Sequence, residues 1–98
     1  MLIFPLKKEW YEKIKNGEKN VEYREVKDYW SKRLKDIVQV LNLCGKPECF
    51  FQLGYNPETR LKATISKIER VAGENTDLKI AKDVYAIHFR LEDKNGIK

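Results

Sequence analysis

The sequence predicts an α+β domain, a small mixed β-barrel of five or six strands with two short helices. Apolar residues recur at helical spacing in residues 7–16, whereas several later segments alternate polar and apolar residues as strands do. The 98 residues contain no repeat and no linker, and they suffice for one domain over residues 1–98. This pattern fits a mixed barrel better than a sandwich or a helical bundle.

Both helices are predicted in the first half of the chain. The first begins at Lys7 and ends at Gly17, because glycine readily adopts the left-handed conformation that stops a helix. The second is capped by Asp28, whose side chain can accept from the free backbone N–H groups of a first turn. Their apolar faces carry, at spacing i and i+4, Trp10 with Ile14 and Trp30 with Leu34.

Strands are predicted where β-branched or aromatic residues form a short apolar run or alternate with polar residues. These segments are residues 2–4, 20–24, 37–44, 61–68 and 84–91, with another short strand beginning at residues 50–51. Residues 37–44 have the strongest strand character of all. The polar residues 92–98 follow no pattern, and we expect disorder there.

The net charge of +5 is concentrated in the first third of the chain. Residues 1–35 hold 10 Lys and Arg against 6 Asp and Glu, a net of +4, and six of the eleven aromatic residues. Cations bind phosphate and aromatic faces stack on bases, so their coincidence favours a nucleic-acid partner. The alternative is an ordinary lysine-rich face in contact with water.

Several functional classes are disfavoured by what the sequence lacks. No secretory signal or membrane-spanning run is recognisable, so we expect a cytoplasmic protein without a membrane partner. Cys44, Cys49 and the single His88 are too few for a zinc site, and we expect neither metal nor cofactor. The glycine-rich nucleotide loops and the usual hydrolase motifs are absent.

Residues 17–24, GEKNVEYR, contain the most informative spacing in the chain. They resemble the G-x-K-x-x-E-x-R signature of ASCH domains, a family of the PUA-like superfamily. The resemblance to a small bacterial and phage-type subset spans nearly the whole chain and is densest over residues 5–34. It is also carried by Pro5-Leu6-Lys7-Lys8, Trp10, Tyr23-Arg24-Glu25-Val26-Lys27, Tyr29-Trp30, Arg33-Leu34, Gly54-Tyr55-Asn56 and Tyr85-Ala86-Ile87.

The resemblance implies a PUA-like barrel whose cleft, lined by Lys19, Glu22 and Arg24, binds RNA or a nucleotide. Some members of the family are hydrolases that act on RNA or on acylated cytidine. In the amidohydrolase branch, which acts on nucleosides such as N4-acetylcytidine, the signature lysine activates a threonine on the following strand. Here Glu22 occupies the threonine position and Asn20 follows the lysine, a departure that argues against this activity.

The three signature residues can also be read from their chemistry. Arg24 presents a planar fork that suits phosphate or guanine, and Glu22 can accept from an exocyclic amine such as that of cytosine. Lys19 supplies a cation, or a base if a neighbouring cation or an apolar cleft lowers its pKa. Lys19 and Glu22 are therefore also the candidate catalytic residues for RNA cleavage. The alternative is that Glu22 and Arg24 form a surface ion pair.

Four aromatic residues near the signature require separate interpretation. Trp10 and Trp30 lie on apolar helical faces, and we expect them in the core. Tyr29 and Tyr55 fall at a helix start and in a loop, so they are the candidates for stacking on a base.

A protein-interaction module remains a further alternative, because a sequence does not distinguish a solvent-filled cleft from a docking surface. The oligomeric state is left open.

Overall fold

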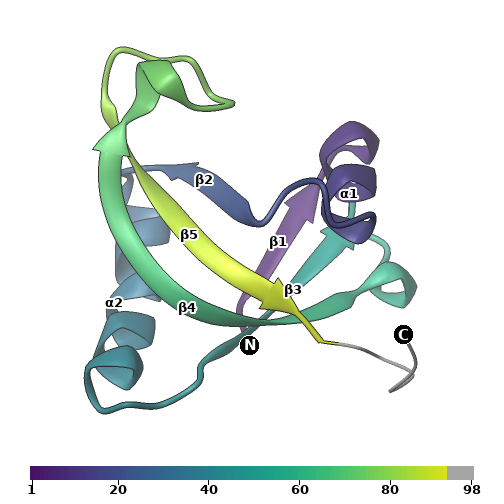
Figure 1. The fold of residues 1–98 in the computed structure, drawn as a ribbon, viewed down its shortest axis with the longest axis horizontal. Coiled ribbons are helices and arrows are strands. Elements are labelled where there is room, and N and C mark those ends of the chain that lie inside the picture. Colours follow the sequence, from purple (N-terminus) through teal and green to yellow (C-terminus); the bar gives the residue numbers. More distant parts are fainter. Residues whose placement is uncertain (93–98) are drawn as a thin grey trace.

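Five strands form one mixed sheet in the order β1-β3-β4-β5-β2, accompanied by two α-helices (Figure 1). The computed structural model describes residues 1–92. The strands are β1 (Ile3–Leu6), β2 (Val21–Glu25), β3 (Glu48–Leu53), β4 (Leu61–Ala72) and β5 (Asp83–Leu91). The helices are α1 (Lys8–Lys15) and α2 (Asp28–Asn42), with 3-10 turns η1 (Pro57–Thr59) and η2 (Gly73–Asn75). The predicted α+β class is confirmed.

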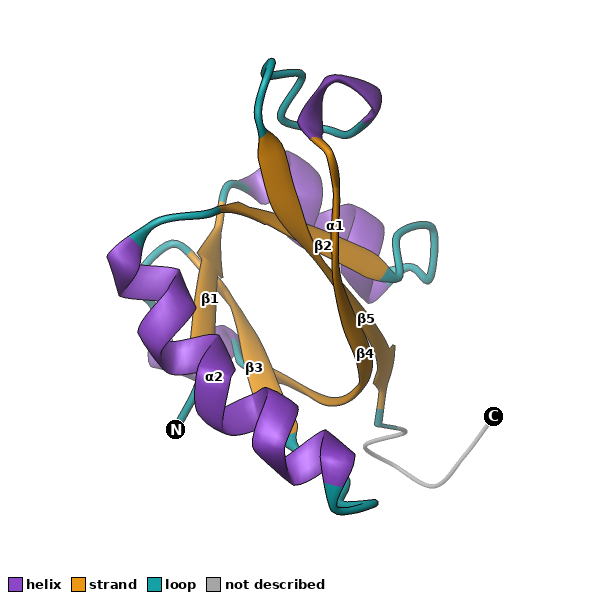
Figure 2. Cartoon of the chain, turned by 90° about the vertical axis from the view of Figure 1, so that its left-hand side faces the viewer, coloured by secondary structure: helices purple, strands orange, loops and turns teal. Residues whose placement is uncertain are grey.

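The sheet is open at both edges. β1 pairs in parallel with β3, and every other neighbouring pair is antiparallel. Figure 2 shows the strands curving around a common interior, with α2 running alongside β1 and β3. Within residues 1–92, β1 and β2 form no backbone ladder with each other, so closure into a barrel stays a prediction.

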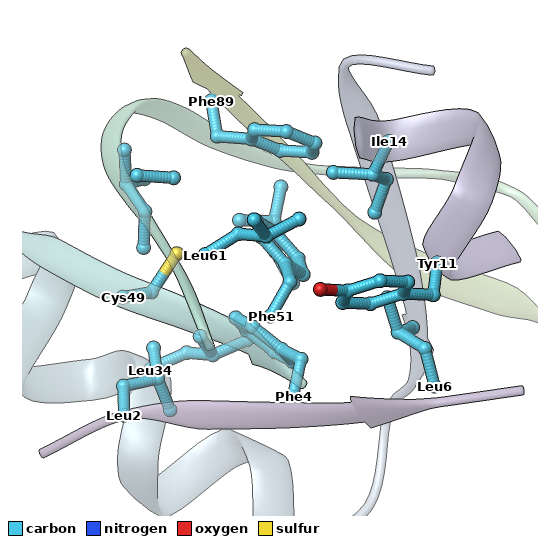
Figure 3. Close-up of a cluster of buried hydrophobic side chains, with 13 residues drawn as sticks. Leu2, Phe4, Leu6, Tyr11, Ile14, Leu34, Cys49, Phe51, Leu61 and Phe89 are labelled. Atoms are coloured by element: carbon cyan, nitrogen blue, oxygen red, sulfur yellow. The ribbon is translucent and has the colours of Figure 1, made fainter. Parts of the chain in front are cut away.

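Apolar side chains from both helices and from four strands fill the interior of the curved sheet (Figure 3). Phe4 of β1 stacks on Phe51 of β3 at a centroid distance of 5.4 Å, and Phe51 lies 4.4 Å from Phe89 of β5. Ile14 of α1 and Leu34 of α2 are also buried in this cluster. Each large side chain contributes about 1.5–3 kcal/mol when it leaves water, so the cluster is the main source of stability.

The predicted strand at residues 37–44 is wrong, because α2 continues through Asn42. Leu34, Ile37 and Leu41 lie on one helical face, and the latter two pack against the buried cluster. This packing overrides the β-propensity of the branched residues. Cys44 then adopts a positive φ of 62°, outside the helix.

Most other element predictions hold, with shifted boundaries. β1 continues through Leu6 despite Pro5, which lies on an edge strand where no ladder bond is lost. β4 runs on to Ala72, beyond the predicted end at residue 68. The segment expected to be disordered falls, apart from Glu92, outside the described residues. None of the helices in residues 1–92 combines the length and apolar character that crossing a membrane requires.

Candidate functional site

Glu22, on the edge strand β2, points toward the interior of the curved sheet. Glu22 pairs with Ile87 of β5 and only 5% of its surface is exposed. Alternation along the strand places Arg24 on the same side, as the sequence predicts. Glu22 and Arg24 do form the ion pair of the alternative interpretation, but its placement at the surface is wrong, because the carboxylate is buried.

Arg24 holds the buried carboxylate through one hydrogen bond and one ion-pair contact. Its Nε donates to Oε2 of Glu22 at 2.8 Å, and its Nη2 lies 2.7 Å from the same oxygen. Nη2 donates to the carbonyl oxygen of Pro5 on β1 at 3.1 Å. The guanidinium carbon lies 5.1 Å from the centre of Phe4 and 4.9 Å from that of Trp30, close enough for cation–π attraction. Arg24 thus connects the two open edges of the sheet through its side chain.

Lys19 is positioned by the turn that ends α1. Gly17 adopts a φ of 82°, which a glycine reaches without strain, and the backbone N–H of Lys19 then donates to the carbonyl of Lys13 at 3.1 Å. The Nζ of Lys19 lies 3.7 Å from Oε1 of Glu22 and 4.9 Å from the ring centre of Tyr23. The ammonium group therefore sits beside the same carboxylate that Arg24 binds, on its other oxygen.

Asp77 also belongs to this group of charges, although the sequence did not reveal it. It lies in the loop between β4 and β5 and forms a salt bridge and hydrogen bond with Lys19. The loop is held by Thr76, whose Oγ1 donates to the Gly73 carbonyl at 2.7 Å and accepts from the backbone N–H of Leu78. Asp77 and Lys19 are 58 residues apart, so no local pattern joins them.

The electrostatics of the group follow from its burial. Burial raises the pKa of Glu22, and the charges of Arg24 and Lys19 oppose that rise. Burial, followed by the negative charge of Asp77, also raises the pKa of Tyr23.

Two adjoining pockets open beside these charges and together form what we call the groove. The lysine pocket, about 260 Å³ in volume, is lined by Trp10, Lys13, Glu18, Lys19, Asn20, Val21, Tyr23 and Asp77. The arginine pocket, about 350 Å³ in volume, is lined by Pro5, Leu6, Lys7, Trp10, Glu22, Tyr23, Arg24, Glu25, Lys27, Trp30 and Leu78. Trp10 and Tyr23 line both. The groove combines aromatic rings with a carboxylate acceptor and fixed cationic donors, which are the groups that recognise a planar heterocycle.

The four aromatic candidates separate into two pairs. Trp10 and Trp30, expected in the core, pack against it only in part and also line the groove. Tyr29 is half exposed, with its ring 4.8 Å from Trp30 and covered by the guanidinium of Arg33 at 3.6 Å. Tyr55, 89% exposed, lies in the loop after β3. The structure does not bring Tyr29 or Tyr55 into the lining of either pocket.

The groove offers few groups for covalent chemistry. Within the described part of the chain, neither pocket is lined by serine, threonine or cysteine. Cys49 is buried in the core, and burial together with the charge of Glu22 raises the pKa of its thiol to about 12, which makes it inert. Residues 1–92 contain no group of three or more His, Cys, Asp or Glu side chains placed to hold a metal ion.

Comparisons of the chain with protein-family models, with curated proteins and with solved structures found no match.

Proposed function

We propose that the groove binds a base of RNA or of a free nucleotide, and that the protein is a small cytoplasmic ASCH domain of PUA-like fold. One observation carries the proposal. Glu22 is buried between Arg24 and Lys19 and lies beside a groove whose lining includes Trp10 and Trp30. The lysine and the arginine of the ASCH-like signature thus both contact its glutamate.

The burial of Glu22 supports a functional role. Removing a carboxylate from water costs several kcal/mol, and ion pairing often fails to recover that cost. Replacing such a pair as a whole by well-packed apolar residues of similar volume is often neutral or stabilising. Buried titratable groups with shifted pKa values in a cleft are typical of functional sites, and Glu22 meets that description.

The chemistry of the groove suits a base better than a simple anion. The indole rings of Trp10 and Trp30 line the groove and can stack on a base, Trp30 only through the face that does not lie on Phe4. The Glu22 carboxylate can accept from an exocyclic amine, and Arg24 can donate to ring nitrogens or carbonyl oxygens. Lys7, Lys13 and Lys27 also line the groove and can contact the backbone phosphates of a strand.

Hydrolysis is less well supported than binding. An acyl transfer through the protein needs a hydroxyl or thiol nucleophile beside its base. Thr76, the hydroxyl residue next to Asp77, is buried and donates to the Gly73 carbonyl. Glu22, the other candidate catalytic residue, can still take a proton from water or from a 2′-hydroxyl, so a ribonuclease remains the alternative, and a protein-interaction module is the second.

Fluorescence anisotropy with a short single-stranded RNA tests the proposal. We expect binding at low salt that weakens as salt rises, with a log–log slope of about −0.7 per phosphate contact. Glu22→Gln should weaken binding about tenfold, because it removes a charged acceptor. Glu48→Gln is the matched control, since Glu48 is exposed on β3 and forms a salt bridge with Lys62. Absence of binding at low salt would overturn the proposal and favour the interaction module.

A further inference from the structure

We infer that Asp77 determines specificity in the groove by keeping phosphate away from Lys19. The inner groove then binds the base, and the phosphate stays outside it, near the other lysines of the lining. The inference rests on the proposed function, which it deepens. It depends on the placement of Asp77 against Lys19, a contact that the signature residues alone do not predict.

The inner charges of the groove cancel one another. Lys19 and Arg24 supply two positive charges, while Glu22 and Asp77 supply two negative ones, and all four lie in one salt-bridged chain. An isolated lysine at this place would attract a phosphate group as a compact cation. Here its charge is already matched, so the inner groove favours a ligand part that carries no net charge.

The surroundings of Lys19 leave little room for a competing anion. Only 9% of its side chain is exposed, and its Nζ lies 5.4 Å and 4.9 Å from the ring centres of Trp10 and Tyr23. Carboxylates of Glu22 and Asp77 approach the same ammonium group. An incoming phosphate would have to displace Asp77, the more exposed of the two carboxylates, and would meet its repulsion on the way.

The loop that carries Asp77 is built to hold it there. The backbone N–H of Gly73 donates to the carbonyl of Lys82 at 2.8 Å, which closes the base of the loop. A Cβ at Gly73 would lie 2.3 Å from that same oxygen, so no other residue fits without moving the backbone. Thr76 ties the next turn to Gly73 and to Leu78. Asp77 is therefore presented to Lys19 by an ordered segment.

Paired titrations with the four ribonucleosides and their 5′-monophosphates test this role. Dissociation constants are measured by NMR or calorimetry at low salt for the wild-type protein and for Asp77→Asn. We expect the best-bound nucleoside and its monophosphate to bind the wild-type protein within about threefold of each other. Asp77→Asn should tighten monophosphate binding at least fivefold, because it frees the charge of Lys19, and should change nucleoside binding less than twofold.

Two further variants sharpen the result. Asp83→Asn makes the same change in net charge at an exposed residue that pairs with Arg70, and it should leave the ratio of the two constants unchanged. In the double variant Lys19→Gln/Asp77→Asn the gain in monophosphate binding should disappear, since Lys19 is its source. The ratio is insensitive to a general loss of folded protein.

The possible outcomes separate this inference from the proposed function. If the nucleoside binds and Asp77→Asn leaves the ratio unchanged, Asp77 does not select against phosphate and the inference alone is overturned. The same holds if the wild-type protein prefers the monophosphate by tenfold or more. If neither the nucleosides, their monophosphates nor RNA bind the wild-type protein, both the proposed function and the inference are overturned.

Discussion

Two regions inside the same curved sheet are equally buried and opposite in chemistry. Phe89, 6% exposed, lies in the apolar cluster beside Phe51, whereas Glu22, 5% exposed, lies at the groove beside Arg24. Burial of the phenyl ring stabilises the fold directly. Burial of the carboxylate costs free energy that its two cationic partners only offset. The difference shows that the first region stabilises the fold, and it supports the proposal that the second serves binding.

The two regions meet at Phe4. Its ring stacks on Phe51 on the core side at 5.4 Å and on Trp30 at 5.1 Å, and the guanidinium of Arg24 lies 5.1 Å from its centre. The groove is therefore built directly on the core. A rigid apolar base of this kind holds Arg24 in one orientation, as a preorganised binding site requires.

The largest effect is expected where the core is opened. Phe51→Ala removes a fully buried ring and should lower the free energy of unfolding by about 3–5 kcal/mol, through lost transfer energy and a residual cavity. Urea denaturation measures it. Phe50→Ala, at the neighbouring and half-buried position, is the control and should cost clearly less. Equal losses would mean that the apolar cluster is not the main stabilising region.

A smaller loss is expected where the ion pair is broken. Arg24→Met leaves Glu22 buried with only Lys19 nearby, at 3.7 Å. We expect a loss of about 2–3 kcal/mol, below the 3–5 typical of fully buried pairs because Arg24 is 17% exposed. Arg70→Met, which breaks an exposed pair with Asp83, should cost about 0–0.5 kcal/mol in the same denaturation assay. Similar losses in both variants would contradict the distinction between the groove and the surface.

The pH dependence of stability distinguishes the groove from the core more finely. Since burial raises the pKa of Glu22 above its usual 4.5, the native state holds this proton at pH values where the unfolded chain has lost it. The stabilisation that the protonated Glu22 gives to the native state is therefore fully present below pH 4.5. It is lost as pH rises through the native pKa, and the free energy of unfolding falls by at most ~1.4 kcal/mol per pH unit.

Unfolding free energies of the wild-type protein and of Glu22→Gln, measured from pH 4 to pH 8, test this sign. The wild-type value should fall relative to the variant as pH rises. Glu48→Gln, which removes an exposed carboxylate, is measured alongside as the control for the change in net charge. A wild-type value that rises instead relative to the variant would mean that Arg24 and Lys19 outweigh burial.

At the lower end of the scale, we expect no measurable hydrolysis of an acylated nucleoside. Incubation with N4-acetylcytidine, followed by chromatography, should show no release of cytidine, because the groove lining within residues 1–92 offers no serine, threonine or cysteine as a nucleophile. Release of cytidine that Lys19→Ala abolishes would make the groove an active site that uses activated water.

The sequence predicted the parts of the site that lie close together along the chain. Lys19, Glu22 and Arg24 fall within six residues, and the alternation of a strand places Glu22 and Arg24 on one side. Their burial was not predicted, because it depends on Pro5 of β1 beside Arg24 and on Trp10 of α1 beside Lys19. Asp77 was missed because only the path of the β4–β5 loop brings it to Lys19.

The fold was predictable where local pattern and tertiary packing agree. In α1, the helical spacing and Gly17 both indicate the observed end, and the alternation of β5 is equally clear. In the second half of α2, the branched side chains favour a strand locally, whereas contacts of Ile37 and Leu41 with the core require a helix. Such a conflict is decided by residues distant in the sequence.

The most direct test of the groove as the ligand site is an NMR titration of the labelled protein with short single-stranded RNA. We expect the largest chemical-shift changes at backbone amides of residues 19–24 and 77–78 and at the indole N–H signals of Trp10 and Trp30. The exposed apolar residues at the end of α2, Val38, Val40 and Leu43, should stay unchanged. Changes confined to the end of α2, or no changes at low salt, would contradict the assignment of the groove.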